Sequence, residues 1–339
     1  MFYNVGGIYG GIGGALLGAQ WGGFDVKFNI EPRTFFNTDT FMNNFPKARC
    51  TTGFDNYKDL RGTPSHLIIG SPDCKQFSNL GTKRKDKGKL HELDPFDFDY
   101  VKFLTAVNHI QPDCFVLENV PNVLKTLWFE GKELRFKGSD SAIYELPNYN
   151  IQTIVLNAID FGVPQSRKRA FVIGAKNFQP EFSFEALEKM GFIELIRKYY
   201  RGKILKEVLD IPEDVPNNKP PRHSAKRIEG FSNLEIGESY YGTQNNLRLN
   251  PEKHAGTIAS HCSRFVHPTE SRVLTVRENA RIMGFPDSFK FYGNESGQLD
   301  QVGKSIVPQV SMAIAYYIKE MLNDLSTKEF LEKLELTNE

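Results

Sequence analysis

Short apolar runs alternate with amphipathic stretches over the first half of this 339-residue chain. Runs of strand length lie at residues 4–8, 24–30, 66–70, 114–117 and 170–174, and helical spacing is found at residues 13–21 and 100–110. Strands that alternate with helices pair in parallel within a doubly wound α/β sheet. Such sheets bind ligands at the carboxyl ends of their strands. The pattern therefore predicts an α/β fold whose functional residues lie at strand ends.

The character of the sequence changes over residues 176–264. Prolines cluster in this stretch and the helical periodicity weakens. Helical spacing returns at residues 276–283 and 307–321. We therefore predict a larger domain made of residues 1–175 and 265–339, interrupted by a small, irregular domain of residues 176–264.

Composition places the chain among ordinary globular proteins, with 40% hydrophobic and 24% charged residues. We expect no membrane span, because no apolar run reaches the roughly 18 residues that a span requires. The first residues carry no basic segment of an export signal, which predicts a cytoplasmic location. The four cysteines lie far apart without a Cys-x-x-Cys pair, so we expect neither a disulfide framework nor a ribbon-type zinc site.

A glycine-rich turn, Tyr9-Gly10-Gly11-Ile12-Gly13-Gly14, follows the first predicted strand. Glycines let a ligand approach the backbone, and a helix N-terminus favours negative charge. Glu31 ends the second predicted strand, where a carboxylate can accept from two ribose hydroxyls. An NAD, FAD or S-adenosylmethionine (SAM) site fits this pattern, and a tight turn without a ligand is the alternative. Leu16 stands where the strict dinucleotide motif has its third glycine.

A cysteine follows the predicted strand at residues 66–70, in Ser71-Pro72-Asp73-Cys74-Lys75-Gln76-Phe77-Ser78. At a strand's carboxyl end, Cys74 is placed to act as a nucleophile if a cation stabilises its thiolate. Lys75, Arg167 and Arg169 are the candidate cations. The alternative is a small buried hydrophobe. We assign that alternative to the other three cysteines, Cys50, Cys114 and Cys262.

Residues 83–89 (Lys-Arg-Lys-Asp-Lys-Gly-Lys) carry five cations. A run of this kind is usually a solvated surface loop. Next to a nucleophile it could instead bind the phosphates of a substrate. Because the net charge of the whole chain is only +1, any nucleic-acid binding must rely on such local concentrations of positive charge.

Six segments of the chain, in order, resemble motifs of the C5-cytosine DNA methyltransferases. Residues 9–14 resemble the family's SAM loop (Phe-x-Gly-x-Gly-Gly), and residues 71–78 resemble its Pro-Cys-x-x-Phe-Ser loop. Glu118-Asn119-Val120 matches Glu-Asn-Val, and residues 165–169 match Gln-x-Arg-x-Arg. Residues 272–287 and 301–305 resemble the last two motifs, so the resemblance extends from Tyr9 to about Tyr317. Each motif alone is a modest signal, whereas six in the family's order are highly specific.

The resemblance implies a Rossmann-like SAM-dependent methyltransferase domain with a small target-recognition domain, acting on a cytosine that is flipped out of double-stranded DNA. It implies that the Cys74 thiolate adds to C6 of the base, and that the resulting enamine takes up the SAM methyl group at C5. Glu118, beside Asn119, would bind N3 and the exocyclic amine as a protonated or proton-sharing acid. Arg167 and Arg169 share one face of an extended segment and would donate to the cytosine O2 and a phosphate. Otherwise Glu118 would form a strand-end salt bridge, and the arginines would lie on a solvated strand face.

The same resemblance implies cofactor contacts by Tyr9, Gly11, Ile12, Gly13, Glu31, Pro32, Asp55 and Ser305, and DNA contacts by Ser78, Lys83, Arg84 and Lys85. We expect no metal, since the spacing of His261, Cys262 and His267 fits no standard site. A basic-aromatic stretch, in which Arg197, Lys198, Arg201 and Lys203 are interleaved with Tyr199 and Tyr200, either contacts DNA or forms a solvated helix face.

Three residues depart from the family's motifs: Asp73 stands where proline is usual, Lys304 stands where asparagine is usual, and Tyr9 stands where phenylalanine is usual, a mild change that keeps an aromatic ring. We expect the Asp73 carboxylate to point away from the Cys74 thiolate, and Lys304 to alter one cofactor contact. The alternatives are a tRNA cytosine-5 methyltransferase, whose Cys-Phe-Thr signature is missing at Cys262, and an inactive DNA-binding regulator. The expected partners are double-stranded DNA and a cognate restriction endonuclease, for a monomer associated with the nucleoid of a prokaryotic or phage-infected cell.

Overall fold

The computed structural model describes residues 3–32, 35–60, 65–73, 98–137, 139–192, 196, 199, 202–241, 245–260 and 264–336. Several residues singled out by the sequence lie outside these ranges: Cys74, Ser78, Lys83, Arg84, Lys85, Arg197, Lys198, Tyr200, Arg201, His261 and Cys262.

A seven-stranded sheet forms the centre of the fold, with the strand order β3-β2-β1-β4-β5-β10-β9. Its strands are β1 (Tyr3–Ile8), β2 (Phe24–Ile30), β3 (Arg49–Thr51), β4 (Leu67–Gly70), β5 (Cys114–Asn119), β9 (Asn150–Asn157) and β10 (Lys168–Ala175). The five strands from β3 to β5 pair in parallel, as predicted for β1, β2, β4 and β5, whereas β3 was not predicted as a strand. The predicted parallel pairing is wrong for β10, which runs antiparallel to both β5 and β9. Only a short connection containing η6 (Ala158–Phe161) joins β9 to β10, and a parallel crossover needs a longer one.

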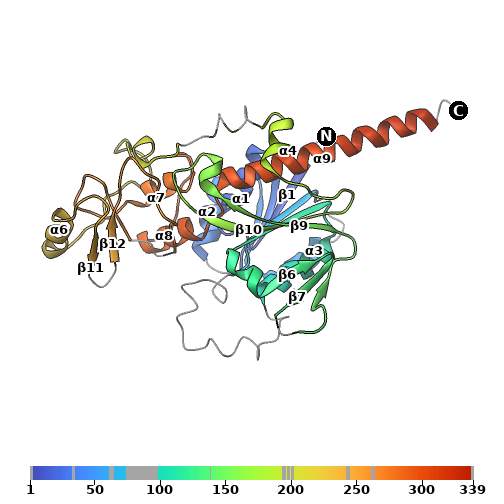
Figure 1. Ribbon diagram of the computed structural model, residues 1–339, viewed down its shortest axis with the longest axis horizontal. Helices are drawn as coiled ribbons and strands as arrows, with labels where there is room; N and C mark the ends of the chain where they lie inside the picture. Colours follow the sequence, from blue (N-terminus) through green and yellow to red (C-terminus); the bar gives the residue numbers. More distant parts are fainter. Residues whose placement is uncertain are drawn as a thin grey trace.

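Both faces of the sheet are apolar and covered, which confirms the doubly wound α/β fold. On one face, Cys114 and Val116 of β5 pack in the core cluster that contains α1 (Gly14–Trp21) and α9 (Pro308–Leu336). On the other face, Phe115 and Leu117 pack with α3 (Asp99–Ile110). Figure 1 shows α1 and α9 on one side of the sheet and α3 on the other. A strand that is buried on both faces reads as a continuous apolar run, which is why the sequence predicted these strands.

Several elements near the sheet were not predicted. The helices α2 (Phe35–Asn44), η1 (Phe54–Leu60) and η5 (Pro121–Lys125) border it. A separate antiparallel sheet joins β6 (Leu127–Glu130), β7 (Glu133–Phe136) and β8 (Tyr144–Glu145). All of them except the ten-residue α2 are too short to carry a clear hydrophobic period.

The chain beyond β10 contains α4 (Phe184–Lys189), η7 (Leu205–Glu207), α6 (Ala225–Ser232), α7 (Val276–Ile282) and α8 (Glu295–Lys304). A small sheet joins β11 (Ser239–Tyr241), β12 (Asn245–Arg248) and β13 (Phe265–Val266), and its strands lie apart from the large sheet in Figure 1. The ring of Phe182 packs edge-on against Tyr317 of α9, so the main core continues past residue 175. The two-domain division of the chain stays a proposal, with β13 belonging to the small sheet.

Within the described part of the chain, no helix has the length and apolar character that crossing a membrane would require.

Candidate functional site

The glycine-rich turn between β1 and α1 depends on backbone angles that favour glycine. Gly11 and Gly13 have φ values of 59° and 92°, and Gly13 precedes the first residue of α1. A Cβ on Gly13 would lie 2.6 Å from the ring of Phe45, so a larger residue would be both strained and obstructed there. At Gly11, by contrast, the space is open, since a Cβ added there would have no described heavy atom within 4 Å. The turn therefore leaves an open approach to the backbone at Gly11.

The buried carboxylate of Glu31 borders this opening. Glu31 directly follows β2, is 0% exposed, and accepts a hydrogen bond from the Gly11 N–H at 2.6 Å through Oε2. The N–H of Glu31 donates to the carbonyl of Thr51, and the half-buried Pro32 follows it in the chain. An acceptor held at the start of a helix beside an open glycine backbone fits the ribose of a nucleoside cofactor. The predicted cofactor residues Gly11 and Glu31 are thus in direct contact.

Tyr9 lies at the opposite side of the turn, with a left-handed φ of 56° and an exposed fraction of 3%. Its ring stacks on Phe54 with a centroid separation of 5.3 Å, and its hydroxyl donates to Asp99 Oδ1 at 3.1 Å. Neither Phe54 nor Asp99 lies in a motif, so neither was predicted to belong to the site. The side chain of the neighbouring Asp55 is 81% exposed and pairs with Lys58 at 2.9 Å, so its assigned cofactor contact stays a proposal.

Ser305, from the last predicted motif, lies against the same turn. A Cβ added to Gly14 would lie 2.0 Å from Ser305 Oγ, so the two residues are in close contact across the chain. Ile12, between the glycines, is buried. Lys304 is half exposed and its ammonium pairs with Asp300 at 2.5 Å. The motif's serine thus reaches the turn, while the lysine pairs within its own helix, α8.

A second group of side chains gathers at the end of β5. Glu118 is 3% exposed, and its Oε2 accepts a hydrogen bond from the Ser71 hydroxyl at 2.5 Å. Its Oε1 lies 3.0 Å from Nε of Arg169, as an ion pair without hydrogen-bond geometry. Residues from three separate motifs therefore meet at one carboxylate.

Asn119 ties the same strand end to the chain that precedes Cys74. Its Nδ2 donates to the carbonyl of Pro72 at 3.3 Å, and its Oδ1 accepts from the N–H of Val120 at 2.8 Å. Asp73, half-buried, is the last described residue before Cys74. The predicted orientation of Asp73 relative to Cys74 involves a residue outside the described ranges. Asn119 thus holds the backbone at Pro72, two residues before the cysteine.

The two arginines of the fourth motif line one small cavity together with Glu118 and apolar side chains that include Phe171 and Val310. Their guanidinium groups nevertheless have different partners. Arg167 is 3% exposed and donates to three carbonyls, those of Ile258 (2.7 Å), Gly303 (3.0 Å) and Ser305 (3.0 Å). Arg169 instead contacts Glu118, so it is better placed than Arg167 to donate to a bound base.

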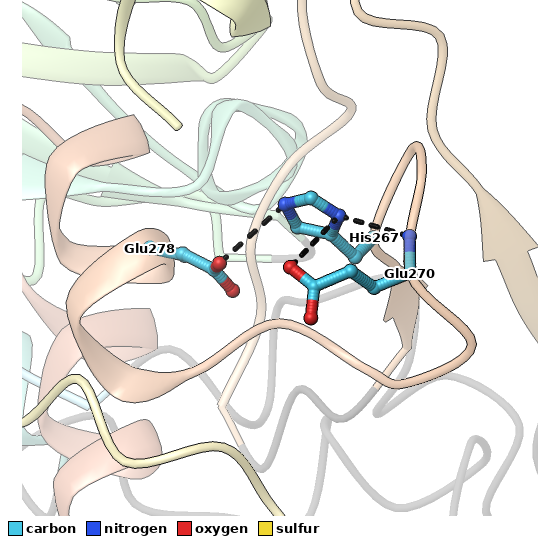
Figure 2. A group of neighbouring side chains, drawn as sticks. All are labelled: His267, Glu270 and Glu278. Atoms are coloured by element: carbon cyan, nitrogen blue, oxygen red, sulfur yellow. Dashed lines mark hydrogen bonds and ion pairs between the residues drawn. The ribbon is translucent and has the colours of Figure 1, made fainter. Parts of the chain in front are cut away.

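His267, Glu270 and Glu278 form the cluster drawn in Figure 2, where the imidazole lies between the two carboxylates. Nδ1 is 3.7 Å from an oxygen of Glu270, and Nε2 is 3.6 Å from an oxygen of Glu278. Nδ1 accepts hydrogen bonds from the N–H groups of Thr269 and Glu270, so the proton of the neutral ring resides on Nε2. Burial lowers the pKa of His267 below its ordinary value.

The guanidinium of Arg272 supplies the positive charge that balances the two carboxylates of this cluster. It makes two hydrogen bonds of 2.8 Å to each of the carboxylates of Glu270 and Glu278. These bonds lower the pKa of Glu270. Glu278 also accepts from the N–H of Thr275, as part of the capping box that begins α7. The cluster is thus an arginine-bridged network that anchors α7, and its ligand atoms are already engaged.

The basic-aromatic stretch is described only at two of its members. Tyr199 stacks on Trp21 of α1 with a centroid separation of 4.3 Å, so that ring packs against the main domain. The N–H of Lys203 donates to Glu207. The proposed DNA contact of this stretch now rests on residues outside the described ranges.

Comparisons with known proteins agree with the motifs. A family model described as "C-5 cytosine-specific DNA methylase" matches residues 3–320. M.MJ0563P of Methanocaldococcus jannaschii is 34% identical over 82% of each chain. The type II methyltransferase M.DdeI of Desulfomicrobium norvegicum is 27% identical over 99% of this chain and 96% of its own. The crystal structure of the S. pombe Dnmt2 methyltransferase shares the fold, with a TM-score of 0.65 at 18% identity over 95% of this chain and 99% of that one.

Proposed function

Because this chain belongs to the C-5 cytosine-specific DNA methylase family, we propose that it transfers a methyl group from SAM to C5 of a cytosine flipped out of double-stranded DNA. One observation carries the proposal. Ser71, Glu118 and Arg169, from three separate motifs, meet at the carboxyl ends of β4 and β5, beside the glycine turn.

The glycine turn is the proposed cofactor site. The open backbone at Gly11 and the buried Glu31 fit the ribose of SAM, which supplies the methyl group. Tyr9, Ile12 and Gly13 form the turn itself. The remaining proposed contacts are Pro32, Asp55 and Ser305, of which Ser305 touches Gly14. The hydrogen bond from Gly11 orients the carboxylate of Glu31, and the carboxylate oxygens would accept hydrogen bonds from the ribose hydroxyls.

The proposed chemistry begins with the sulfur of Cys74, whose thiolate forms a bond to C6 of the cytosine. Glu118 shares a proton with N3, which accepts the electron density displaced from the C5–C6 double bond. C5 of the resulting enamine would then form a bond to the methyl carbon of SAM while the bond from that carbon to the SAM sulfur breaks, so that S-adenosylhomocysteine is the product that leaves. Loss of the C5 proton and breakage of the C6–sulfur bond restore the double bond and release Cys74.

The arginines and Asn119 have distinct proposed roles. Arg169, in contact with Glu118, would donate to the cytosine O2. Arg167 holds the carbonyls of residues 258, 303 and 305, so it would position the pocket walls and not reach a phosphate. Asn119 would hold the Pro72 backbone and thereby the chain that leads to Cys74.

Ser78, Lys83, Arg84 and Lys85 are the proposed contacts to the DNA backbone. The relative M.DdeI is named as a type II methyltransferase, which supports a cognate restriction endonuclease as a functional partner of this chain too. We further propose a monomer that acts without a metal ion, in the cytoplasm and at the nucleoid.

The test uses DNA in which 5-fluorocytosine replaces cytosine, because fluorine cannot leave C5 as a proton does and the covalent complex is trapped. Incubation with methyl-labelled SAM should give a protein–DNA adduct that survives denaturation. Cys74→Ala should abolish the adduct. Cys50→Ala is the matched control, since burial raises the pKa of Cys50 to about 11 and keeps it a thiol.

Three results would contradict this function. An adduct formed by the Cys74→Ala variant would assign the nucleophile elsewhere. Adduct and methyl transfer on tRNA alone would establish the RNA substrate, and the absence of both on either substrate would leave a non-enzymatic DNA-binding regulator. Bisulfite sequencing of DNA from an expressing host would then identify the methylated site.

A further inference from the structure

Ser71 directly follows β4, the strand that lies between β1 and β5 in the sheet. Its N–H donates to the carbonyl of Tyr9, which directly follows β1, at 3.2 Å. Its hydroxyl donates to Oε2 of Glu118, near the end of β5, at 2.5 Å. One residue thus links the glycine turn on one side to the buried carboxylate on the other.

The hydroxyl of Ser71 determines how the Glu118 carboxylate is turned. A carboxylate rotates easily about its last torsion, so its plane is set by its partners. Oε1 faces Nε of Arg169 at 3.0 Å but receives no hydrogen bond from any described residue. The bond from Ser71 to Oε2 therefore holds the plane and leaves Oε1 available as an acceptor or proton carrier.

The backbone contact of Ser71 makes this orientation precise. Its N–H is held by Tyr9, and the next residue, Pro72, is held by Asn119 beside Glu118. The serine is therefore fixed from two directions before its hydroxyl reaches the carboxylate. Hydrogen bonds to charged groups are short and directional, which suits a positioning role.

We propose that Ser71 is a positioning residue for methyl transfer: it holds Oε2 of Glu118 so that Oε1 meets N3 of the bound cytosine. This inference rests on the proposed function, in which Glu118 shares its proton with N3. Ser71 touches neither the base nor the methyl donor in this scheme, and acts through Glu118. Since proton sharing matters after the base is bound, the hydroxyl contributes to kcat and little to the KM for SAM.

The test compares four substitutions by steady-state methylation of cytosine-containing DNA. Ser71→Ala removes the hydroxyl, and the pair Ser71→Thr and Ser71→Val differs only in having a hydroxyl or a methyl group at one position. We expect Ala and Val to lower kcat by about 10- to 100-fold, as general-acid groups lose efficiency when misplaced. Thr should keep at least about a third of kcat, and the KM for SAM should change less than about threefold in all of them. Thr105→Val is the matched control, because its hydroxyl donates to the carbonyl of Val101 within α3 and touches neither Glu118 nor the glycine turn.

The outcomes separate this proposal from the function on which it rests. Wild-type protein that methylates no cytosine contradicts the function itself. Wild-type activity with kcat of Ser71→Ala and Ser71→Val within twofold of it overturns the positioning role alone. Equal losses of kcat in Ser71→Thr and Ser71→Val would also overturn the positioning role, because they would show that side-chain packing and not the hydroxyl causes the loss. Thermal unfolding of each variant identifies any that fails to fold. If Ser71→Ala fails to fold, the comparison of kcat between Ser71→Thr and Ser71→Val tests the positioning role.

Discussion

The hydroxyl of Tyr9 donates a hydrogen bond to Oδ1 of Asp99 at 3.1 Å, and so joins the glycine turn to the first residue of α3. The related motif has phenylalanine at this position, which could not make the bond. The carbonyl of Tyr9 also accepts a hydrogen bond from the N–H of Ser71. Tyr9 is therefore bonded to the chain on both sides of residues 74–97.

Replacing Tyr9 with phenylalanine should lower the free energy of unfolding by about 1 kcal/mol, the net value of a typical hydrogen bond. It should also raise the KM for SAM severalfold, because the turn loses one of its restraints. Tyr3→Phe is the control, since it removes a hydroxyl bond to Asn323, away from the turn. Urea unfolding and SAM titrations check both effects. If the two variants have the same KM, the bond to Asp99 has no part in cofactor binding.

Substituting glutamine for Glu31 should weaken SAM binding about 10- to 100-fold, which corresponds to the loss of a charge-assisted hydrogen bond. The glutamine amide keeps the shape of the side chain but removes the negative charge beside Gly11. Asp25→Asn offers a control from β2, the strand that Glu31 follows, because Asp25 is exposed and pairs with Lys27. Isothermal titration calorimetry with SAM gives the comparison. Unchanged affinity in Glu31→Gln would remove Glu31 from the cofactor site.

The two arginines of the fourth motif should respond differently to substitution by methionine. Arg167→Met leaves three buried carbonyls without their donor and should lower the free energy of unfolding by about 3 kcal/mol. Arg169→Met should lower stability less than Arg167→Met does, because Glu118 keeps its hydrogen bond from Ser71, and should lower kcat by about 10- to 100-fold. Urea unfolding and single-turnover kinetics separate the two effects. A large stability loss in Arg169→Met would reverse these assignments.

Stability should fall as the pH drops below about 6.5, the ordinary pKa of histidine. Burial lowers the pKa of His267, so the folded protein keeps the ring neutral while the unfolded chain takes up a proton. Burial lowers the pKa of His223 as well, with the same sign. His267→Gln should therefore flatten the pH dependence between pH 7 and 5 by about 1 kcal/mol. A slope equal to that of the unsubstituted protein would show that His267 does not carry the effect.

Millimolar EDTA should leave kcat unchanged, and the purified protein should hold far less than one equivalent of zinc. The reason is the guanidinium of Arg272, which already satisfies both carboxylates of the His267 cluster. Elemental analysis and methylation assays with and without chelator give the result. Loss of activity with EDTA, restored by a divalent ion, would require a metal site after all.

The sequence predicted most of the parallel sheet, because strands buried on two faces read as unbroken apolar runs. It did not predict the direction of β10, since apolar content is the same for either direction and only the short link from β9 decides. The motifs located Glu118 and Arg169 but treated Arg167 as its equivalent. Alternation along a strand indicates that both side chains share a face. It does not reveal that carbonyls from residues 258–305, far away in the chain, accept the hydrogen bonds of Arg167.

Phe54 and Asp99 could not be predicted from the sequence for a related reason. Neither lies in a motif, and each gains its importance from a contact with Tyr9 that forms only when the sheet brings distant segments together. Ser71 begins a motif, but its hydroxyl bond to Glu118 depends on β4 lying beside β5 and has no signal in the sequence.

The packing of α1 against α9 has a consequence for synthesis of the protein on the ribosome. Ser311 of α9 donates to the carbonyl of Ala15, and Ser305 lies against Gly14, so residues near the end of the chain support the turn near its beginning. The first glycines therefore leave the ribosome long before their support exists. The contacts that support the glycine turn can therefore form only after translation has nearly finished.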